Sequence, residues 1–183
     1  MGGALRVAIL TVSDAGSRGV RADRSGDAIV AWADAASFVV VRRALVPDRS
    51  ERIAAELVAW CDGGTVDLVL TTGGTGLSPS DVTPEATRAV LDREAPGISE
   101  RLRTLLIDRF PLAALSRGVA GVRGRTLVIN LPGSTAGVLD GLAALAPIVR
   151  HAVAVVRGGG GEHQAHGGAE PALDQRGAAG EGT

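Results

Sequence analysis

Lysine is absent from this 183-residue chain, and all 19 residues counted as lysine or arginine are arginines. A phosphate-binding loop of the Walker A type needs a lysine that reaches the terminal phosphates, and a Schiff-base enzyme needs a lysine amine. The sequence excludes both classes. Cysteine occurs once, at Cys61, which excludes a disulfide within the chain, a zinc site built from cysteines and an iron–sulfur cluster.

A dominant charge and a long apolar run are also missing. The formal net charge is −1, which gives no reason to expect binding to nucleic acid or to an anionic membrane. The first apolar run is short, and the apolar stretch 138–156 is interrupted by Asp140, Pro147 and Arg150. We therefore expect a cytoplasmic protein with no targeting segment and no membrane span. Its chemistry must come from carboxylates, hydroxyls, arginines, backbone amides and a borrowed metal ion.

The composition divides the chain into a folded part and a tail. Hydrophobic residues make up 45% and charged residues 21%, close to the usual balance of a globular protein, which predicts one domain over residues 1–157. Residues 158–183 are mainly glycine, alanine, glutamate, glutamine and histidine. They bury too little apolar surface to offset the entropy of ordering, so we expect a disordered tail. Its His163 and His166 are more typical of a solvated segment than of a metal site.

Strand-like and helix-like segments alternate along the predicted domain. Continuous apolar or β-branched runs predict buried strands at 5–12, 37–45, 66–72 and 126–130. Helices are expected to start at residues 25 or 26, 50, 83 and 98, and a last one follows 131–134 and ends near residue 157. This alternation predicts an α/β fold with three layers, in which a mostly parallel sheet carries helices on both faces.

Two hydroxyl residues are expected to cap helices. Ser50 precedes Ile53, Leu57 and Trp60, which follow the spacing of one helix face, and a serine at that point is a favourable N-cap. Thr83 is a good N-cap as well, because the proline that follows it suits the first helical position.

A buried strand, a glycine-containing turn and a helix start follow one another three times, at 7–27, 66–86 and 126–137. In an open parallel sheet such turns lie at the carboxyl ends of the strands, where ligands bind. Free backbone amides and helix N-termini together attract anions. A single turn of this kind is a routine connection. The three together favour a cradle for a polyanionic ligand, built without lysine.

The second turn contains GGTG at 73–76. It is not the dinucleotide fingerprint, because LSPS follows and no helix starts directly. A TGGT string also occurs in asparaginase-type amidohydrolases, but those enzymes need a lysine to activate the threonine. We therefore interpret the loop as backbone amides that wrap around a phosphate or a heterocycle.

Two aspartates, Asp48 and Asp81, each come just after a predicted strand on the ligand side of the sheet. An aspartate in a loop is often only a turn former or a helix cap. Two that face an anion cradle suggest instead a Mg²⁺ ion held by carboxylates and substrate phosphates together. Asp14 and Asp23 are weaker candidates, and Asp23 is as well placed to cap a helix as to touch a ligand.

The motifs stand in a characteristic combination. They are TVSD at 11–14, DRSG at 23–26, VPD at 46–48, TTGGTG at 71–76, DVTPEAT at 81–87 and the segment from SR at 116 to LPGS at 131–134. Over about residues 5–155 the chain resembles the MogA/MoaB family of molybdenum cofactor biosynthesis, the molybdopterin adenylyltransferases. The resemblance implies an α/β domain that transfers AMP from Mg-ATP to molybdopterin and releases pyrophosphate. It also implies a homo-oligomer, trimeric or hexameric, and a separate insertase that takes the product.

The resemblance also implies which residues act. Asp48 and Asp81 match the family's catalytic aspartates, to which we assign the metal and the reacting phosphates. The substrate phosphate is largely dianionic at neutral pH, since its second pKa is about 6, so no general base is required. The remaining residues match regions that line the nucleotide and pterin pocket: Ser13, Asp14, Ser25, Gly26, Thr72, Gly73, Gly74, Thr75, Gly76, Asn130, Pro132, Gly133 and Ser134.

Two other functions remain open from the sequence. A pterin-binding carrier or scaffold would hand molybdopterin to an insertase without transferring AMP, and its affinity for pterin would not depend on ATP, Mg²⁺ or Asp81. An unrelated nucleotide-binding α/β domain would bind ATP with no preference for pterin.

Overall fold

The computed structural model describes residues 4–107 and 110–158. The tail predicted after residue 157, apart from Gly158, lies outside the described residues, and so do His163 and His166. Those predictions are therefore untested.

A six-stranded mixed sheet forms the centre of the molecule, with the strand order β2-β1-β3-β6-β5-β4. Strands β1 (Arg6–Val12), β2 (Val39–Val46), β3 (Leu68–Thr72) and β6 (Thr126–Leu131) are parallel, whereas β5 (Ala120–Arg123) and β4 (Arg93–Glu94) form antiparallel pairs beyond β6. The prediction of a mostly parallel α/β sheet is confirmed. Because the four parallel strands end at the same edge, the loops that follow them meet there.

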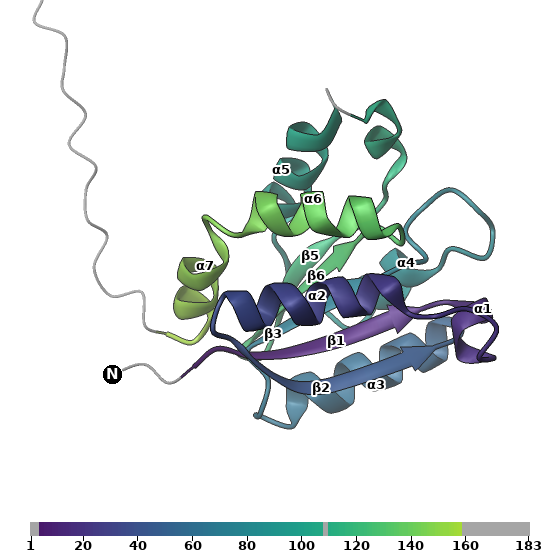
Figure 1. Cartoon of the computed structure of the whole chain (residues 1–183). Helices are drawn as coiled ribbons and strands as arrows, with labels where there is room; N and C mark the ends of the chain where they lie inside the picture. The colour runs from purple at the N-terminus through teal and green to yellow at the C-terminus, as the bar shows by residue number, and fades with distance from the viewer. Residues whose placement is uncertain (1–3, 108–109, 159–183) are drawn as a thin grey trace, which may run out of the picture.

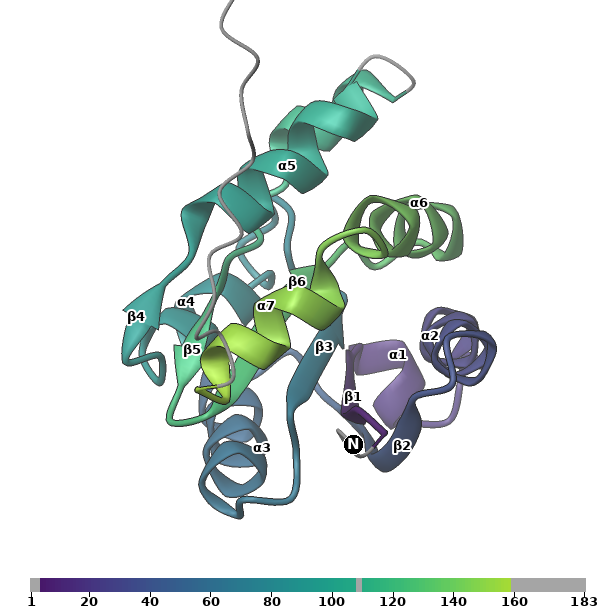
Figure 2. The same ribbon diagram turned by 90° about the vertical axis from the view of Figure 1, so that its left-hand side faces the viewer.

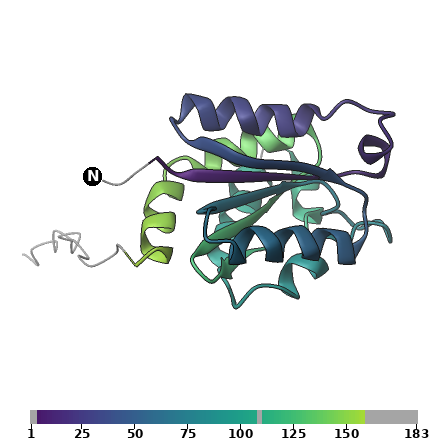
Figure 3. The ribbon, with the colours of Figure 1, turned by 90° about the horizontal axis from the view of Figure 1, so that it is seen from below.

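Helices cover both faces of the sheet (Figures 1 and 3). On one face lie α2 (Arg24–Ala35), α5 (Pro96–Ile107), α6 (Thr135–Leu145) and α7 (Val149–Val156), and on the other lie α3 (Ser50–Asp62) and α4 (Thr83–Arg88). Strand β1 divides its side chains between the two layers, because Val7 and Ile9 pack toward α2 whereas Ala8 and Leu10 pack toward α3. Burial on both faces explains the continuous apolar run of this strand.

Helix starts differ from the sequence predictions at four points, one of them α5, which begins at Pro96 rather than near residue 98. Helix α2 begins at Arg24, because the Asp23 carboxylate accepts a hydrogen bond from the Gly26 amide and caps the helix. Ser50 is the first residue of α3 rather than its cap, and the N-cap residue makes no capping side-chain bond. Thr83 is likewise the first residue of α4, and its hydroxyl donates to the Gly73 carbonyl instead. The Thr83 hydroxyl therefore makes a tertiary hydrogen bond in place of the N-cap bond that the local sequence predicts.

Other elements were not expected from the sequence. The predicted last helix is two helices, α6 and α7, with Pro147 between them. Short elements also appear at α1 (Asp14–Ser17), β4 and the 3-10 helix η1 (Pro111–Leu115). Elements of two to five residues carry too little periodic pattern to be recognised locally. Within the described ranges no single helix is long and apolar enough to cross a membrane; only α6 and α7 together, bent by 68°, reach that length and composition.

The opposite edge of the sheet is held by a buried aspartate, Asp67. Its carboxylate accepts hydrogen bonds from the backbone amide of Arg6 (2.9 Å) and from two nitrogens of the Arg6 guanidinium (2.8 and 3.1 Å), and Arg157 lies 3.6 Å away. Burial opposes ionisation of Asp67, but the bonds from Arg6 outweigh it, so the pKa of Asp67 lies below its ordinary value of 3.8.

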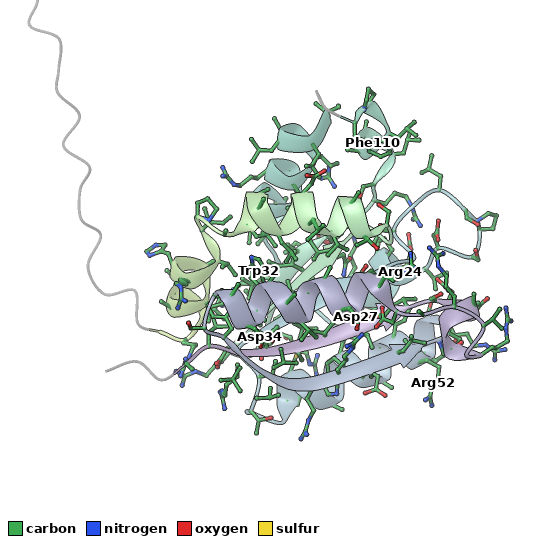
Figure 4. All side chains as sticks on the ribbon, viewed as in Figure 1. Arg24, Asp27, Trp32, Asp34, Arg52 and Phe110 are labelled. Carbon is green, nitrogen blue, oxygen red and sulfur yellow. The ribbon has the colours of Figure 1, made fainter. Side chains whose placement is uncertain are left out.

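Replacement of Asp67 by asparagine should reduce the free energy of unfolding at pH 7 by about 2 kcal/mol, because a charge-assisted pair to a half-exposed arginine is lost. A lowered pKa stabilises the fold above the unfolded value of 3.8, and this contribution disappears as the pH falls through the folded value. Urea unfolding at pH 7 and at pH 3 measures the difference, which should shrink at the lower pH. An equal difference at both values would contradict the assignment. Asp34→Asn, at an exposed position on α2 (Figure 4), is the control.

Candidate functional site

Three loops converge at the carboxyl edge of the parallel strands. They follow β1, β3 and β6, as the sequence predicts, and they border two adjoining cavities. The smaller has a volume of about 360 Å³ and the larger about 640 Å³. Gly74, Asp81, Gly133 and Ser134 line both cavities, so the two meet at Asp81.

The smaller cavity is polar. It is lined by Ser13 at the end of β1, by Arg21 and Arg24 near the start of α2, and by Asp48 after β2. Figure 4 shows Arg24 at the end of α2 that lies next to this edge. Arginine side chains and a helix N-terminus beside carboxylates suit a ligand that combines phosphate groups with a cation.

The larger cavity has an apolar wall that no sequence pattern indicated. Leu102 and Leu106 of α5 face it, together with Phe110 and Leu115 at the ends of η1. Helix α5 projects beyond the sheet (Figure 2), and Phe110 lies at the far end of this projection (Figure 4). Such a wall suits a flat, largely apolar ring. Leucines spaced along a helix look the same in a sequence whether they fill a core or line a cavity.

At Gly73 and Gly74 the loop after β3 runs too close to its neighbours for any side chain. Gly73 has a φ of +99°, and a Cβ on it would lie 2.2 Å from the Val12 carbonyl oxygen. Gly74 has a φ of +62°, and its Cβ would lie 2.4 Å from the Thr83 hydroxyl and 2.9 Å from an Asp48 carboxylate oxygen. At these two positions the loop therefore presents backbone rather than side chains to the cavities.

The turn after β6 packs directly on this loop. A Cβ on Gly133 would lie 3.2 Å from the Gly73 Cα, and the Thr72 hydroxyl donates a 2.7 Å hydrogen bond to the Pro132 carbonyl. Ser134 accepts from the Gly137 amide and caps α6. The ends of β3 and β6 thus form one continuous surface.

Asp48 is held by a reciprocal pair of hydrogen bonds with Asp14. The Asp48 carboxylate accepts from the Asp14 amide (2.9 Å), and the Asp14 carboxylate accepts from the Asp48 amide (3.2 Å). Desolvation raises the pKa of Asp48, and the negative charges of Asp14 and Asp81 raise it further against these bonds. The carboxylate of Asp48 is thus repelled by two others, and a bound cation would relieve this repulsion.

Asp81 stands at the boundary of the two cavities. Its carboxylate accepts from the Ser78 amide (3.1 Å), and its own amide donates to the Ser78 carbonyl (2.9 Å), which closes the turn after the glycine loop. Among residues 4–107 and 110–158, no group of three histidine, cysteine or acidic side chains is arranged to hold a metal ion. Asp48 and Asp81 supply only two carboxylates, so a bound Mg²⁺ would need oxygen atoms of the substrate to complete its coordination.

The structure separates the predicted site residues by role. All except Asp14 and Gly26 line one of the cavities. Gly26 instead makes room for the cap of α2, since a Cβ on it would lie 2.2 Å from the Asp23 carboxylate. The Asn130 amide group donates to Thr71 and Thr87 (2.9 and 3.0 Å), and its oxygen accepts from the Val119 amide. Asn130 therefore holds β6 to its neighbours beneath the cavity.

Comparisons with known proteins find similar sequences and structures over most of the chain. The family model described as "Probable molybdopterin binding domain" matches residues 8–151. The chain is 36% identical over 156 residues to the molybdopterin adenylyltransferase of Helicobacter pylori strain J99, an alignment that covers 84% of this chain and 89% of that protein. It is 38% identical over 160 residues to Gephyrin of Dictyostelium discoideum, covering 82% of this chain but only 22% of Gephyrin.

Among solved structures, the molybdopterin biosynthesis enzyme MoaB of Thermus thermophilus is similar over most of its length. The two chains superpose with a TM-score of 0.80 and are 51% identical, and the match covers 84% of this chain and 97% of that one.

Proposed function

Since this chain belongs to the family described as the probable molybdopterin binding domain, we propose that it acts in molybdenum cofactor biosynthesis as a molybdopterin adenylyltransferase. The reaction transfers AMP from ATP to the terminal phosphate of molybdopterin and releases pyrophosphate. The observation that carries the proposal is the position of Asp48 and Asp81. Both line the polar cavity, and Asp81 also borders the larger apolar one.

The two cavities suit the two parts of such a reaction. Phosphate groups fit the polar cavity, where Arg21 and Arg24 offer positive charge and Gly73 and Gly74 bring the backbone close. A heterocyclic ring fits the larger cavity against Leu102 and Leu106. Reacting phosphates then meet where the cavities join, beside Asp81.

The chemistry requires positioning more than proton transfer. A phosphate oxygen of molybdopterin attacks the α-phosphorus of ATP, and a new P–O bond forms. The bond from the α-phosphorus to the oxygen bridging the β-phosphorus breaks, and its electron pair leaves with pyrophosphate. The attacking oxygen carries no proton, because the second pKa of a phosphate monoester is about 6. No base is therefore needed, and Asp48 and Asp81 act by holding charge in place.

The residues present fit a magnesium ion shared with substrate. Asp48 and Asp81 would hold it, with phosphate oxygens as the remaining ligands. The pKa of Asp48 is raised first by burial and then by the negative charges of Asp14 and Asp81, which a cation would offset. Magnesium, when bound, offsets the charge of the two phosphate chains that must approach each other.

We extend the proposal to the setting of the enzyme: a cytoplasmic homo-oligomer, a trimer or a hexamer, that passes its product to an insertase. Support for self-association comes from apolar side chains that are exposed on α5 and α6 and line neither cavity: Leu105, Ile107 and Leu139.

Incubation of the purified chain with molybdopterin, ATP and Mg²⁺ should yield adenylyl-molybdopterin and pyrophosphate in equal amounts. Chelation of Mg²⁺ by EDTA should lower the rate by about 100-fold or more, because the clustered charge is no longer offset. Chromatography of the pterin product and a pyrophosphate assay measure both. Tight pterin binding without any AMP transfer, at every Mg²⁺ concentration, would replace the enzyme with the carrier function. ATP binding without pterin binding would indicate an unrelated nucleotide-binding domain.

A further inference from the structure

Arg117 directs its guanidinium at the loop that carries Asp81. The Nε atom donates to the Gly76 carbonyl (2.7 Å), and one terminal nitrogen donates to the Asp81 carbonyl (2.5 Å). The Arg117 amide also donates to the Thr75 carbonyl (2.9 Å). Three carbonyl groups of the segment 75–81 are therefore held by one residue that lies 36 positions from Asp81.

The other terminal nitrogen of Arg117 pairs with the carboxylate of Glu85 in the first turn of α4. Burial opposes ionisation of Glu85, but its own backbone amide and Arg117 outweigh it, so the pKa of Glu85 is lowered. Glu85 is therefore charged at neutral pH and fixes the orientation of the guanidinium plane. A planar donor fork of this kind binds three acceptors in a defined geometry, which a lysine ammonium does not.

The loop has few other supports. Apart from hydrogen bonds among Ser78, Ser80 and Asp81, the loop is joined to the start of α4 by Thr83. The Thr83 amide donates to the Gly74 carbonyl (3.1 Å) and its hydroxyl donates to the Gly73 carbonyl (2.9 Å). Residues 77–80 are exposed. Without Arg117, the turn that carries Asp81 would be joined to the body only at its ends.

Arg117 is not placed to bind a substrate phosphate. It lines neither cavity, although its neighbours Ser116 and Gly118 line the larger one. All three of its guanidinium nitrogens already point at protein acceptors. Its charge is balanced by Glu85 rather than left for an anion.

From this geometry we infer that Arg117 and Glu85 are a positioning pair for Asp81, which they hold at the junction of the two cavities through the backbone of residues 75–81. The inference rests on the proposed adenylyl transfer only in predicting that kcat falls when the pair is broken. The restraint on the loop is a property of the protein alone and can be measured without substrate.

The test compares Arg117→Met, Arg117→Lys and Glu85→Gln with matched controls on α3, Arg52→Met and Glu51→Gln. Both control positions are exposed, and Figure 4 shows Arg52 at the lower margin of the molecule. Hydrogen exchange measured by mass spectrometry reports on peptides covering 75–82, with peptides from β1 and β6 as internal references. Steady-state kinetics of adenylyl transfer give kcat and KM for ATP and for molybdopterin.

In Arg117→Met, exchange in 75–82 should become about 10-fold faster while β1 and β6 are unchanged, because only local opening is affected. Loss of position should lower kcat by about 100-fold and change each KM by no more than about 3-fold. Arg117→Lys should recover little, since it restores the charge but not the two carbonyl bonds. Glu85→Gln should have a smaller effect in the same direction, and both controls should behave as the parent.

Unchanged exchange in 75–82 would overturn the inference, whatever the kinetics. Faster exchange with an unchanged kcat would overturn it as well. A rise in KM for ATP with normal exchange would make Arg117 a phosphate ligand instead. If the parent protein transfers no AMP, the proposed function fails, and exchange alone then decides whether Arg117 and Glu85 restrain the loop.

Discussion

Replacement of Asp81 by asparagine is expected to lower the rate of adenylyl transfer by about 10³-fold, near the upper end of what the loss of one preorganised charge-stabilising group costs. The substitution keeps the shape of the side chain, and its amide oxygen still accepts from the Ser78 amide, so the turn is preserved. What is lost is negative charge where the two cavities join. The effect should appear in kcat, because Asp81 would act on the reacting phosphates through the cation that it holds, and not on the rings.

The measurement is single-turnover formation of adenylyl-molybdopterin, with pterin affinity determined separately by fluorescence. Asp34→Asn, which removes a charge from the exposed face of α2, should retain the parent rate. An Asp81→Asn protein that keeps its rate within about threefold would remove Asp81 from the transfer step. A loss of pterin affinity in place of a loss of rate would make Asp81 a binding residue only.

Replacement of Gly73 by alanine should have the largest effect on the fold. The φ of +99° is unfavourable for alanine, and the new methyl group would lie 2.2 Å from the Val12 carbonyl oxygen, so the backbone of β1 or of the loop must move. We expect the free energy of unfolding to fall by about 3 kcal/mol or more, the strain and the overlap acting together. Adenylyl transfer should be lost as well, because the loop forms part of both cavities.

Gly124→Ala is the matched control for this substitution. Gly124 also has a positive φ (+54°), but a Cβ on it would meet nothing within 4 Å. The substitution should therefore lower the free energy of unfolding by only about 1 kcal/mol, because of backbone strain. Urea unfolding of both variants measures the difference. Equal losses of stability would show that the contact with Val12 relaxes easily and does not require glycine.

Much of the fold follows from local pattern in the sequence. The apolar runs of β1, β3 and β6 are long enough to be recognised as strands buried on both faces, and their alternation with helices predicts a parallel sheet. The short antiparallel strand β4, the 3-10 helix η1 and the break before α7 were not predictable in the same way. Their conformations depend on what packs against them rather than on their own few residues.

The candidate site also has a part that the local sequence predicts and a part that depends on tertiary contacts. Local pattern was enough to place Asp48, Asp81 and the glycine loop at one edge, because parallel strands end together and turn residues follow them. The folded chain was needed to show that Asp14 holds Asp48, that Asn130 faces inward and that Arg117 holds the turn of Asp81. The folded chain was also needed to show that α5 forms a wall of the larger cavity. Turn and strand preferences act between neighbours in the chain, whereas these hydrogen bonds join residues 34 to 59 positions apart, and folding alone brings such residues together.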